Sequence, residues 1–138
     1  MSNFANSNFA EADFARAMPF ARLLGLEVTD ATPEKVVGTI TVRAELCTIG
    51  ESAHGGTLMA FADCLAAIGA HLDRPEGAAG TITIESKTNF LARAASGARL
   101  SGTALPVSVG RRVSVWQTRI EDESKRAIAL SVQTQLIL

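Results

Sequence analysis

Apolar residues along the 138-residue chain recur at two spacings, one typical of helices and one typical of strands. Helical spacing runs from about Asp13 to Leu24, is interrupted at Pro19 and stops at Gly25. A longer segment, from Ser52 to Leu72, is apolar over most of its helical surface. The pattern therefore predicts a short helix near the N-terminus and one long buried helix.

Strand-like alternation fills most of the remaining chain, in the segments 35–46, 80–94, 98–109, 111–122 and 125–138. Pro106 weakens the third of these, and a tight polar turn joins the last two. The expected order is a helix, two strands, the long helix, and three or four long strands. Because the strands are grouped rather than alternating with helices, we expect an α+β fold, with an antiparallel sheet wrapped around the long helix.

Alternation also predicts which side chains share a face of a strand. In the segment 80–94, one face is expected to carry Ile82, Ile84, Ser86, Thr88 and Phe90, and the opposite face Thr81, Thr83, Glu85, Lys87 and Asn89. In the last strand a shared face is expected for Ile128, Leu130, Val132, Thr134, Leu136 and Leu138.

Composition narrows the function classes. The chain is 47% hydrophobic and 20% charged, as a globular protein is, and its net charge of -1 offers no basic field for nucleic acid or an anionic membrane. No unbroken apolar run approaches the roughly 18 residues of a membrane span. No secretory leader is recognisable, and Cys47 and Cys64 fit a reducing compartment, so we expect a cytoplasmic protein. Residues 1–20 are interpreted as an N-terminal arm with the start of the short helix, and residues 21–138 as a single domain.

The long helix opens with His54-Gly55-Gly56 and carries one acid, Asp63. The first N–H groups of a helix have no intrahelical partner, and with the helix dipole they favour a carbonyl oxygen that gains negative charge. Glycine there lets a ligand approach the backbone closely. Gly55 and Asp63 are eight residues apart, about 12 Å of helix rise, which is too far for one reacting carbon. The spacing favours a site in which two copies pack their helices antiparallel.

The segment "HGGTLMAFADCLAAIGA" resembles the signature helix of the hotdog-fold acyl-CoA thioesterases, of the phenylacetate-catabolism (PaaI-type) branch. Its histidine, two glycines and acid match the family pattern at His54, Gly55, Gly56 and Asp63, and the resemblance extends over nearly the whole chain from about Ala21. It implies a hotdog fold, dimers that often pair into homotetramers, and hydrolysis of an acyl-CoA to the free acid and CoA. Asp63 would act as nucleophile or as general base, while the Gly55 N–H polarises the thioester carbonyl.

The resemblance assigns roles to three further catalytic candidates. Thr83 matches a Ser or Thr position whose hydroxyl helps to hold the acid or its water. Thr48 stands where the family commonly has Asn or Gln, and its shorter side chain is a departure from the pattern. His54 is interpreted as organising the loop rather than as a general base.

Substrate contacts are expected at a second set of residues. Gly56 would leave room beside the backbone for the substrate, and Phe90 would line the acyl pocket together with Phe61. The stretch Gly110, Arg111 and Arg112 matches a segment that often meets the coenzyme A phosphates, a ligand that suits arginine. Ala60, Ala66 and Ala67 leave space for an aryl or medium-chain acyl group.

Other functions remain open from the residues alone. A hotdog module that binds acyl-CoA without hydrolysing it is the alternative from another class, and a structural oligomer without ligand is a third. A dehydratase of the same superfold would need an Asp/His pair in a motif that is absent. We expect no metal, since His54, Asp63 and His71 do not converge, and no cofactor, since coenzyme A is part of the substrate.

Overall fold

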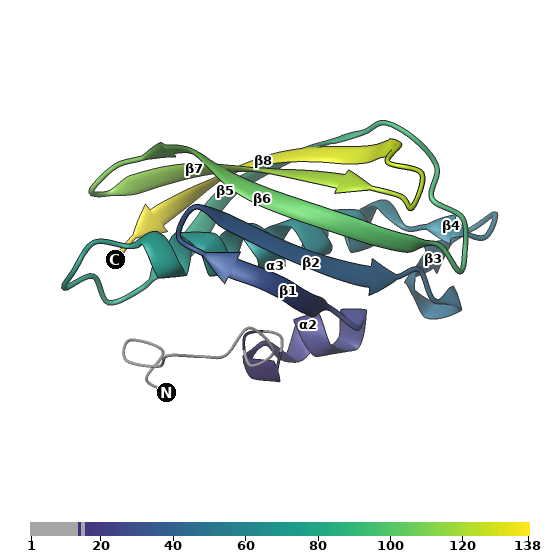
Figure 1. The fold of residues 1–138 in the computed structure, drawn as a ribbon, viewed down its shortest axis with the longest axis horizontal. Helices are drawn as coiled ribbons and strands as arrows, with labels where there is room; N and C mark the ends of the chain where they lie inside the picture. The colour runs from purple at the N-terminus through teal and green to yellow at the C-terminus, as the bar shows by residue number, and fades with distance from the viewer. Residues whose placement is uncertain (1–13, 15) are drawn as a thin grey trace.

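The computed structural model describes Phe14 and residues 16–138 (Figure 1), so the predicted N-terminal arm lies largely outside the described residues. Residues 14, 16 and 17 are helical, and α2 follows as Pro19–Leu24. Proline occupies the first turn of α2, where its missing N–H costs nothing, and Gly25 ends the helix in the left-handed region with φ 72°. The interruption at Pro19 and the stop at Gly25 are therefore confirmed.

A six-stranded antiparallel sheet has the order β1-β2-β6-β7-β8-β5 and curves around the long helix α3, Gly55–Asp73 (Figure 1). The strands are β1 (Glu27–Thr32), β2 (Lys35–Thr41), β5 (Thr81–Phe90), β6 (Arg99–Val109), β7 (Val113–Glu121) and β8 (Ala127–Ile137). A 3-10 turn (Ala44–Leu46) and a short hairpin, β3 (Cys47–Thr48) with β4 (Ser52–Ala53), precede α3. This order confirms the α+β prediction, and a bulge after Pro106 marks the weak point expected in β6.

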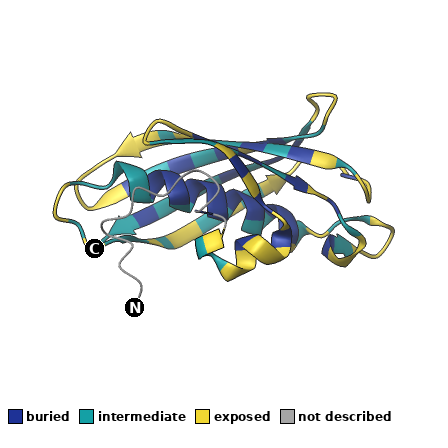
Figure 2. Cartoon of the chain, turned by 60° about the horizontal axis from the view of Figure 1, so that its bottom comes forward, coloured by how far each residue is buried: buried dark blue, intermediate teal, exposed yellow. Residues whose placement is uncertain are grey.

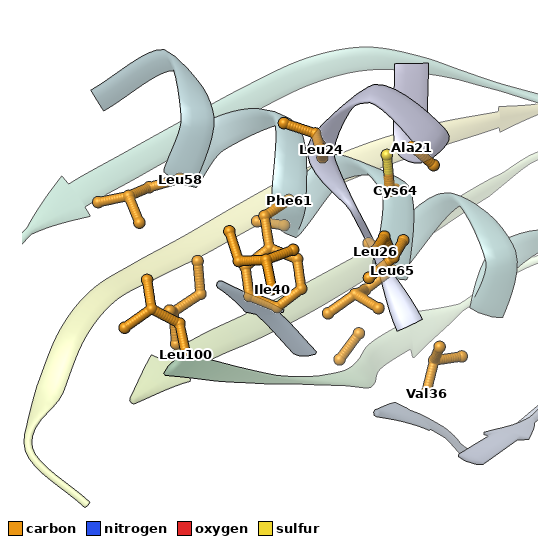
Figure 3. Packing of buried hydrophobic residues seen from close by; sticks show 14 of the residues in the cluster. Ala21, Leu24, Leu26, Val36, Ile40, Leu58, Phe61, Cys64, Leu65 and Leu100 are labelled. Carbon is orange, nitrogen blue, oxygen red and sulfur yellow. The ribbon is translucent and has the colours of Figure 1, made fainter. Parts of the chain in front are cut away.

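Glycines set how closely α3 approaches the sheet. Gly38 of β2 and Gly102 of β6 pair across the ladder, and a Cβ on either would lie 2.8 or 2.6 Å from a methyl carbon of Leu65. Figure 3 shows Leu65 and Phe61 of α3 packed in this core. One turn further along, Gly69 lies directly against the ring of Trp116. At these three glycines a large side chain of one layer packs directly against the backbone of the other, which brings the helix close to the sheet.

By length and mean hydropathy (1.3), α3 could cross a membrane, a test that the core helix of a globular domain also passes. In this fold 56% of its apolar window is buried inside the protein. Figure 2 shows the buried residues along α3 and the facing strands.

The predicted faces of β5 are wrong beyond its first residues, because a β-bulge lies between Thr83 and Glu85. The extra residue shifts the alternation, so Thr83, Ser86 and Thr88 all face α3, while Ile82 and Ile84 stay 50% and 56% exposed on the outer face. In β8 the buried face carries Ala129, Ser131, Gln133 and Gln135. Leu130, Val132, Thr134 and Leu136 share the opposite face, as predicted. The prediction that Ile128 lies with them is wrong, because the register between β7 and β8 shifts at this point and Ile128 is fully buried.

We predict that Gly69→Ala destabilises the fold. The new Cβ would lie 2.4 Å from Cζ3 of Trp116, whose side chain is fully buried and cannot move aside. Overpacking of this kind costs about 1–3 kcal/mol, against a gain of roughly 1 kcal/mol from the better helix propensity of alanine. Urea denaturation measures the difference. Gly80→Ala is the control, since nothing lies within 4 Å of its Cβ position. A Gly69→Ala protein as stable as the wild type would contradict the close contact between Gly69 and the Trp116 ring.

Candidate active site

His54 caps the start of α3. Its Nδ1 accepts a hydrogen bond from the Gly56 N–H at 2.8 Å. The Leu46 carbonyl oxygen anchors the same turn, because it accepts from the His54 N–H and from Oγ1 of Thr57, both at 2.9 Å. The cap occupies the N–H of Gly56, and the N–H groups of Thr57 and Leu58 donate to the His54 carbonyl oxygen. The N–H of Gly55, at the first helical position, has no acceptor among the residues that the structure describes.

Phe90 lies over Gly55. A Cβ added to Gly55 would come within 3.2 and 3.3 Å of the Phe90 ring, which is 53% exposed. Because the bulge in β5 turns Phe90 toward α3, the ring and the glycine backbone together form an apolar edge beside the free donor. Thr48 lies six residues before His54 and is exposed on the β3–β4 hairpin, opposite Ser52.

Asp63 is held by two strands. Its Oδ1 accepts a hydrogen bond from Oγ1 of Thr83 on β5 and another from Nε2 of Gln133 on β8, both at 2.8 Å. Nε2 of Gln135 in turn donates to Oγ1 of Thr83 at 2.7 Å. Both glutamines are only 1% exposed. The structure therefore brings the predicted Asp63 and Thr83 together and adds two residues that the sequence interpretation missed.

The direction of these bonds follows from the chemistry of the groups. An amide nitrogen only donates, so the Thr83 oxygen accepts from Gln135 and its own hydrogen points at Asp63. Both donors to the carboxylate end on Oδ1. The other oxygen, Oδ2, is left as the one that can meet a substrate or a water.

Cys64 is next to the acid in sequence and is no candidate nucleophile. Burial, and secondly the neighbouring Asp63 carboxylate, raise the pKa of its thiol to about 12. The thiolate is the reactive form of cysteine, so this side chain is inert near neutral pH. Cys47 is half-buried, and its Sγ donates to the Arg43 carbonyl oxygen at 3.4 Å. Within residue 14 and residues 16–138, no three His, Cys, Asp or Glu side chains gather as a metal site would require.

The remaining predicted contacts lie in the turn between β6 and β7. Arg111 and Arg112 are exposed there, and the Gly110 N–H closes the turn on the Val113 carbonyl oxygen at 2.9 Å. This turn lies at the opposite end of the sheet from the start of α3 (Figure 1). Ser114, two residues after Arg112, pairs with Gln135 of β8, and Gln135 pairs on its other side with Thr83 of β5. The turn therefore lies closer to the Thr83 and Asp63 end of the site than to the start of α3.

Comparison with known proteins gives this geometry a family context. Residues 50–129 match the model of the family described as "Thioesterase superfamily". A Deinococcus radiodurans protein named as an esterase is 29% identical over 126 residues, 91% of this chain and 83% of its own length. The acyl-coenzyme A thioesterase PaaI of Escherichia coli is 27% identical over 110 residues, 80% of this chain and 76% of its own.

A solved structure agrees with these sequence matches. A variant of the phenylacetic acid degradation protein PaaI from Thermus thermophilus superposes with a TM-score of 0.81 at 27% identity, and the match covers 88% of this chain and 100% of that one. Together the matches confirm the predicted hotdog fold and the resemblance from which it was inferred.

We predict that Cys64 resists alkylation in the folded protein. Because its pKa is raised to about 12, the thiolate fraction stays negligible up to pH 10 and grows only as the pH nears that value. Mass spectrometry after iodoacetamide treatment at pH 8 should find Cys64 unmodified, and modified once urea is added. The half-buried Cys47 serves as the internal comparison. Rapid native labelling of Cys64 at pH 8 would return it to the list of candidate nucleophiles.

Proposed function

We propose, from the premise that the chain belongs to the thioesterase superfamily, that it hydrolyses acyl-coenzyme A thioesters to the free acid and coenzyme A. The similarity to an acyl-coenzyme A thioesterase supports this substrate class. The observation that carries the proposal is the Asp63 carboxylate, with one oxygen held by Thr83 and Gln133 and the other unengaged by them. A fixed carboxylate oxygen and a backbone N–H donor are the two groups that thioester hydrolysis requires.

Two routes are open to this carboxylate. In one, Oδ2 of Asp63 attacks the thioester carbonyl carbon, the coenzyme A thiolate leaves, and water then hydrolyses the resulting anhydride. In the other, Oδ2 takes a proton from a water that attacks the same carbon, and that proton goes on to the departing thiolate. Both routes develop negative charge on the carbonyl oxygen, which the Gly55 N–H stabilises. Neither needs a metal or a cofactor.

We further propose that the site forms between two copies of the chain. Gly55 and Asp63 of one chain are separated by about 12 Å of helix rise, so one copy cannot place both on the same carbonyl. Strand β5, which holds Thr83, is at the edge of the sheet, where its free backbone groups suit pairing with a second strand. Two-fold pairing of β5 with its symmetry mate sets the two α3 helices antiparallel and brings Gly55 of one copy toward Asp63 of the other.

Small side chains on α3 fit this arrangement. Asp63, Ala60 and Ala67 lie on one half-buried stripe of α3. The two alanines are small enough for the backbone of a second copy to come close. The exposed Ile82, Ile84 and Val113 on the outer face of the sheet support pairing of dimers into a homotetramer. Arg111 and Arg112 would meet the coenzyme A phosphates from their turn on the Asp63 side, and Thr48 would act from the Gly55 side.

We predict that Asp63→Asn abolishes thiol release from acyl-CoA and leaves the fold intact. The Asn carbonyl oxygen can accept both bonds now made to Oδ1, and the NH₂ group then takes the place of Oδ2. The network is kept while the reacting oxygen is lost. Thiol release is followed with a chromogenic disulfide, and thermal melts report the fold. Wild-type turnover by Asp63→Asn would exclude Asp63 from the reaction.

The hydroxyl of Thr83 gives a graded test of the same site. Thr83→Val keeps the shape and removes a hydrogen bond to a charged group, worth about 1.5–3 kcal/mol, so kcat should fall roughly 10- to 100-fold. Thr88→Val is the matched control on the same face of β5, since the Thr88 hydroxyl bonds to Ser131 rather than to Asp63. Equal losses in the two variants would contradict a specific role for Thr83.

A further inference from the structure

Strand β5 forms one open edge of the sheet. Among the residues that the structure describes, β8 is its only neighbouring strand, so the other row of backbone N–H and C=O groups along Thr81–Phe90 has no partner strand. An open edge of this kind suits pairing with another extended strand. In the shared site proposed above, that strand is β5 of a second copy, and the register of the pair decides which side chains meet.

A two-fold axis limits the registers that are possible. In an antiparallel pair, side chains directly opposite each other lie on the same face of the sheet. When the two strands are identical, the axis must therefore pass through one residue that faces itself, and the residues before and after it face each other. Beyond the bulge, β5 alternates regularly, with Glu85 and Lys87 pointing outward and Ser86 and Thr88 toward α3.

The charges of β5 discriminate between these registers. With the axis at Ser86, Glu85 of each copy faces Lys87 of the other, and two ion pairs form. With the axis at Glu85 or at Lys87, that residue faces its own counterpart, and like charges directly opposite each other destabilise a sheet. With the axis at Thr88, Lys87 faces Asn89 and gains no ion pair. Of these positions, only Ser86 pairs opposite charges.

The hydroxyl of Ser86 also favours an axis at this residue. Its Oγ is buried and has no hydrogen-bond partner among the described residues. When Ser86 faces itself across the axis, rotation about χ1 lets the two hydroxyls bond to each other, as Ser and Thr side chains do across antiparallel strands. The axis thus gives a partner to a polar group that the single chain leaves without one.

The same axis agrees with the arrangement of the site. Along β5, Ser86 lies between Thr83, which bonds to Asp63, and Phe90. The Phe90 ring lies over Gly55. A half-turn at Ser86 therefore carries the Gly55 end of one copy toward the Asp63 end of the other.

We propose that two copies of the chain pair β5 in this single register, with the two-fold axis at Ser86 and an ion pair between Glu85 and Lys87 on each side of it. The inference rests on the proposed shared site and goes beyond it by naming the residues that fix the register. Exposed ion pairs add little stability, so their main effect is to exclude the neighbouring registers, in which like charges meet. Moving the axis by one residue displaces the copies by two positions, about 7 Å, which would separate Gly55 from Asp63 of the other copy.

Disulfide formation measures the register. In the proposed pair the two Ser86 Cα atoms are about 4.5–5.5 Å apart, a distance that a disulfide spans. Ser86→Cys should therefore form a covalent dimer under mild oxidation, seen on a non-reducing gel, above the background of wild type with its native Cys47 and Cys64. Thr88→Cys is the matched control on the same face, since its two copies would be about 14 Å apart. Cross-linking of Thr88→Cys, or none of Ser86→Cys, would overturn the register.

Charge exchange tests what selects that register. Glu85→Lys turns both ion pairs into repulsions and should raise the dimer Kd, measured by sedimentation at low salt, about tenfold or more. The double variant Glu85→Lys/Lys87→Glu exchanges the charges and should restore the wild-type Kd, because opposite charges again face each other. Glu34→Lys makes the same charge change in the turn between β1 and β2, at the other edge of the sheet, and should leave the Kd unchanged. A double variant that dimerises as weakly as Glu85→Lys would contradict the pairing.

Neither measurement needs a substrate, so the register and the proposed hydrolysis fail separately. Cross-linking of Ser86→Cys in a protein that releases no thiol from any acyl-CoA would overturn the proposed function and keep the register. Thiol release by a protein whose Ser86→Cys variant does not cross-link would keep the thioesterase and overturn the register.

Discussion

The half-buried carboxylate of Asp63, on a largely apolar helix, is stabilised by hydrogen bonds from two strands. A charge partly removed from water is costly without partners, and here Thr83 and Gln133 each donate to Oδ1 at 2.8 Å. Those residues come from β5 and β8, which are far apart in sequence and adjacent in the sheet. The strand order of the fold therefore matters for Asp63. Because β8 is the neighbour of β5, Gln133 lies close enough to add a second hydrogen bond to the one from Thr83.

That contact depends in turn on how closely the helix lies on the sheet. The side chain of Leu65 packs against Gly38 and Gly102, and the ring of Trp116 packs against Gly69. At these three positions there is no room for an added methyl group between α3 and the strands. A helix held further away would carry Asp63 out of reach of Thr83 and Gln133. The inner face of β8 accordingly exchanges apolar side chains for Ser131, Gln133 and Gln135. Apolar packing between β8 and α3 is reduced by these polar side chains, and one of them, Gln133, instead holds the Asp63 carboxylate in position.

Much of the fold was predictable from the sequence, and the features that were not predicted have physical causes. The long helix and the order of the strands follow from periodicity and from a recognisable family pattern, and helix-end donors and the same pattern select Gly55 and Asp63 as candidates for the site. The bulge after Thr83 could not be predicted, because alternation assumes an unbroken ladder and a single extra residue reverses it. Gln133 and Gln135 were missed because alternation groups residues by face without saying which face is inward. Their one signal in the sequence is that two glutamines, two residues apart, share a face of a strand whose opposite face is rich in Leu and Val.

The central claim is that each reaction centre takes Asp63 from one copy and the Gly55 N–H from another, and a complementation measurement tests it most directly. Gly55→Pro removes the N–H at a helix position that tolerates proline, and Gly55→Ala, which keeps the N–H, controls for the added bulk near Phe90. Gly55→Pro and Asp63→Asn should each be inactive alone. Co-expressed with different tags, they should form mixed dimers with one complete site each, and random assortment restores about a quarter of wild-type thiol release. Mixed dimers that are isolated through both tags and remain inactive would contradict the shared site.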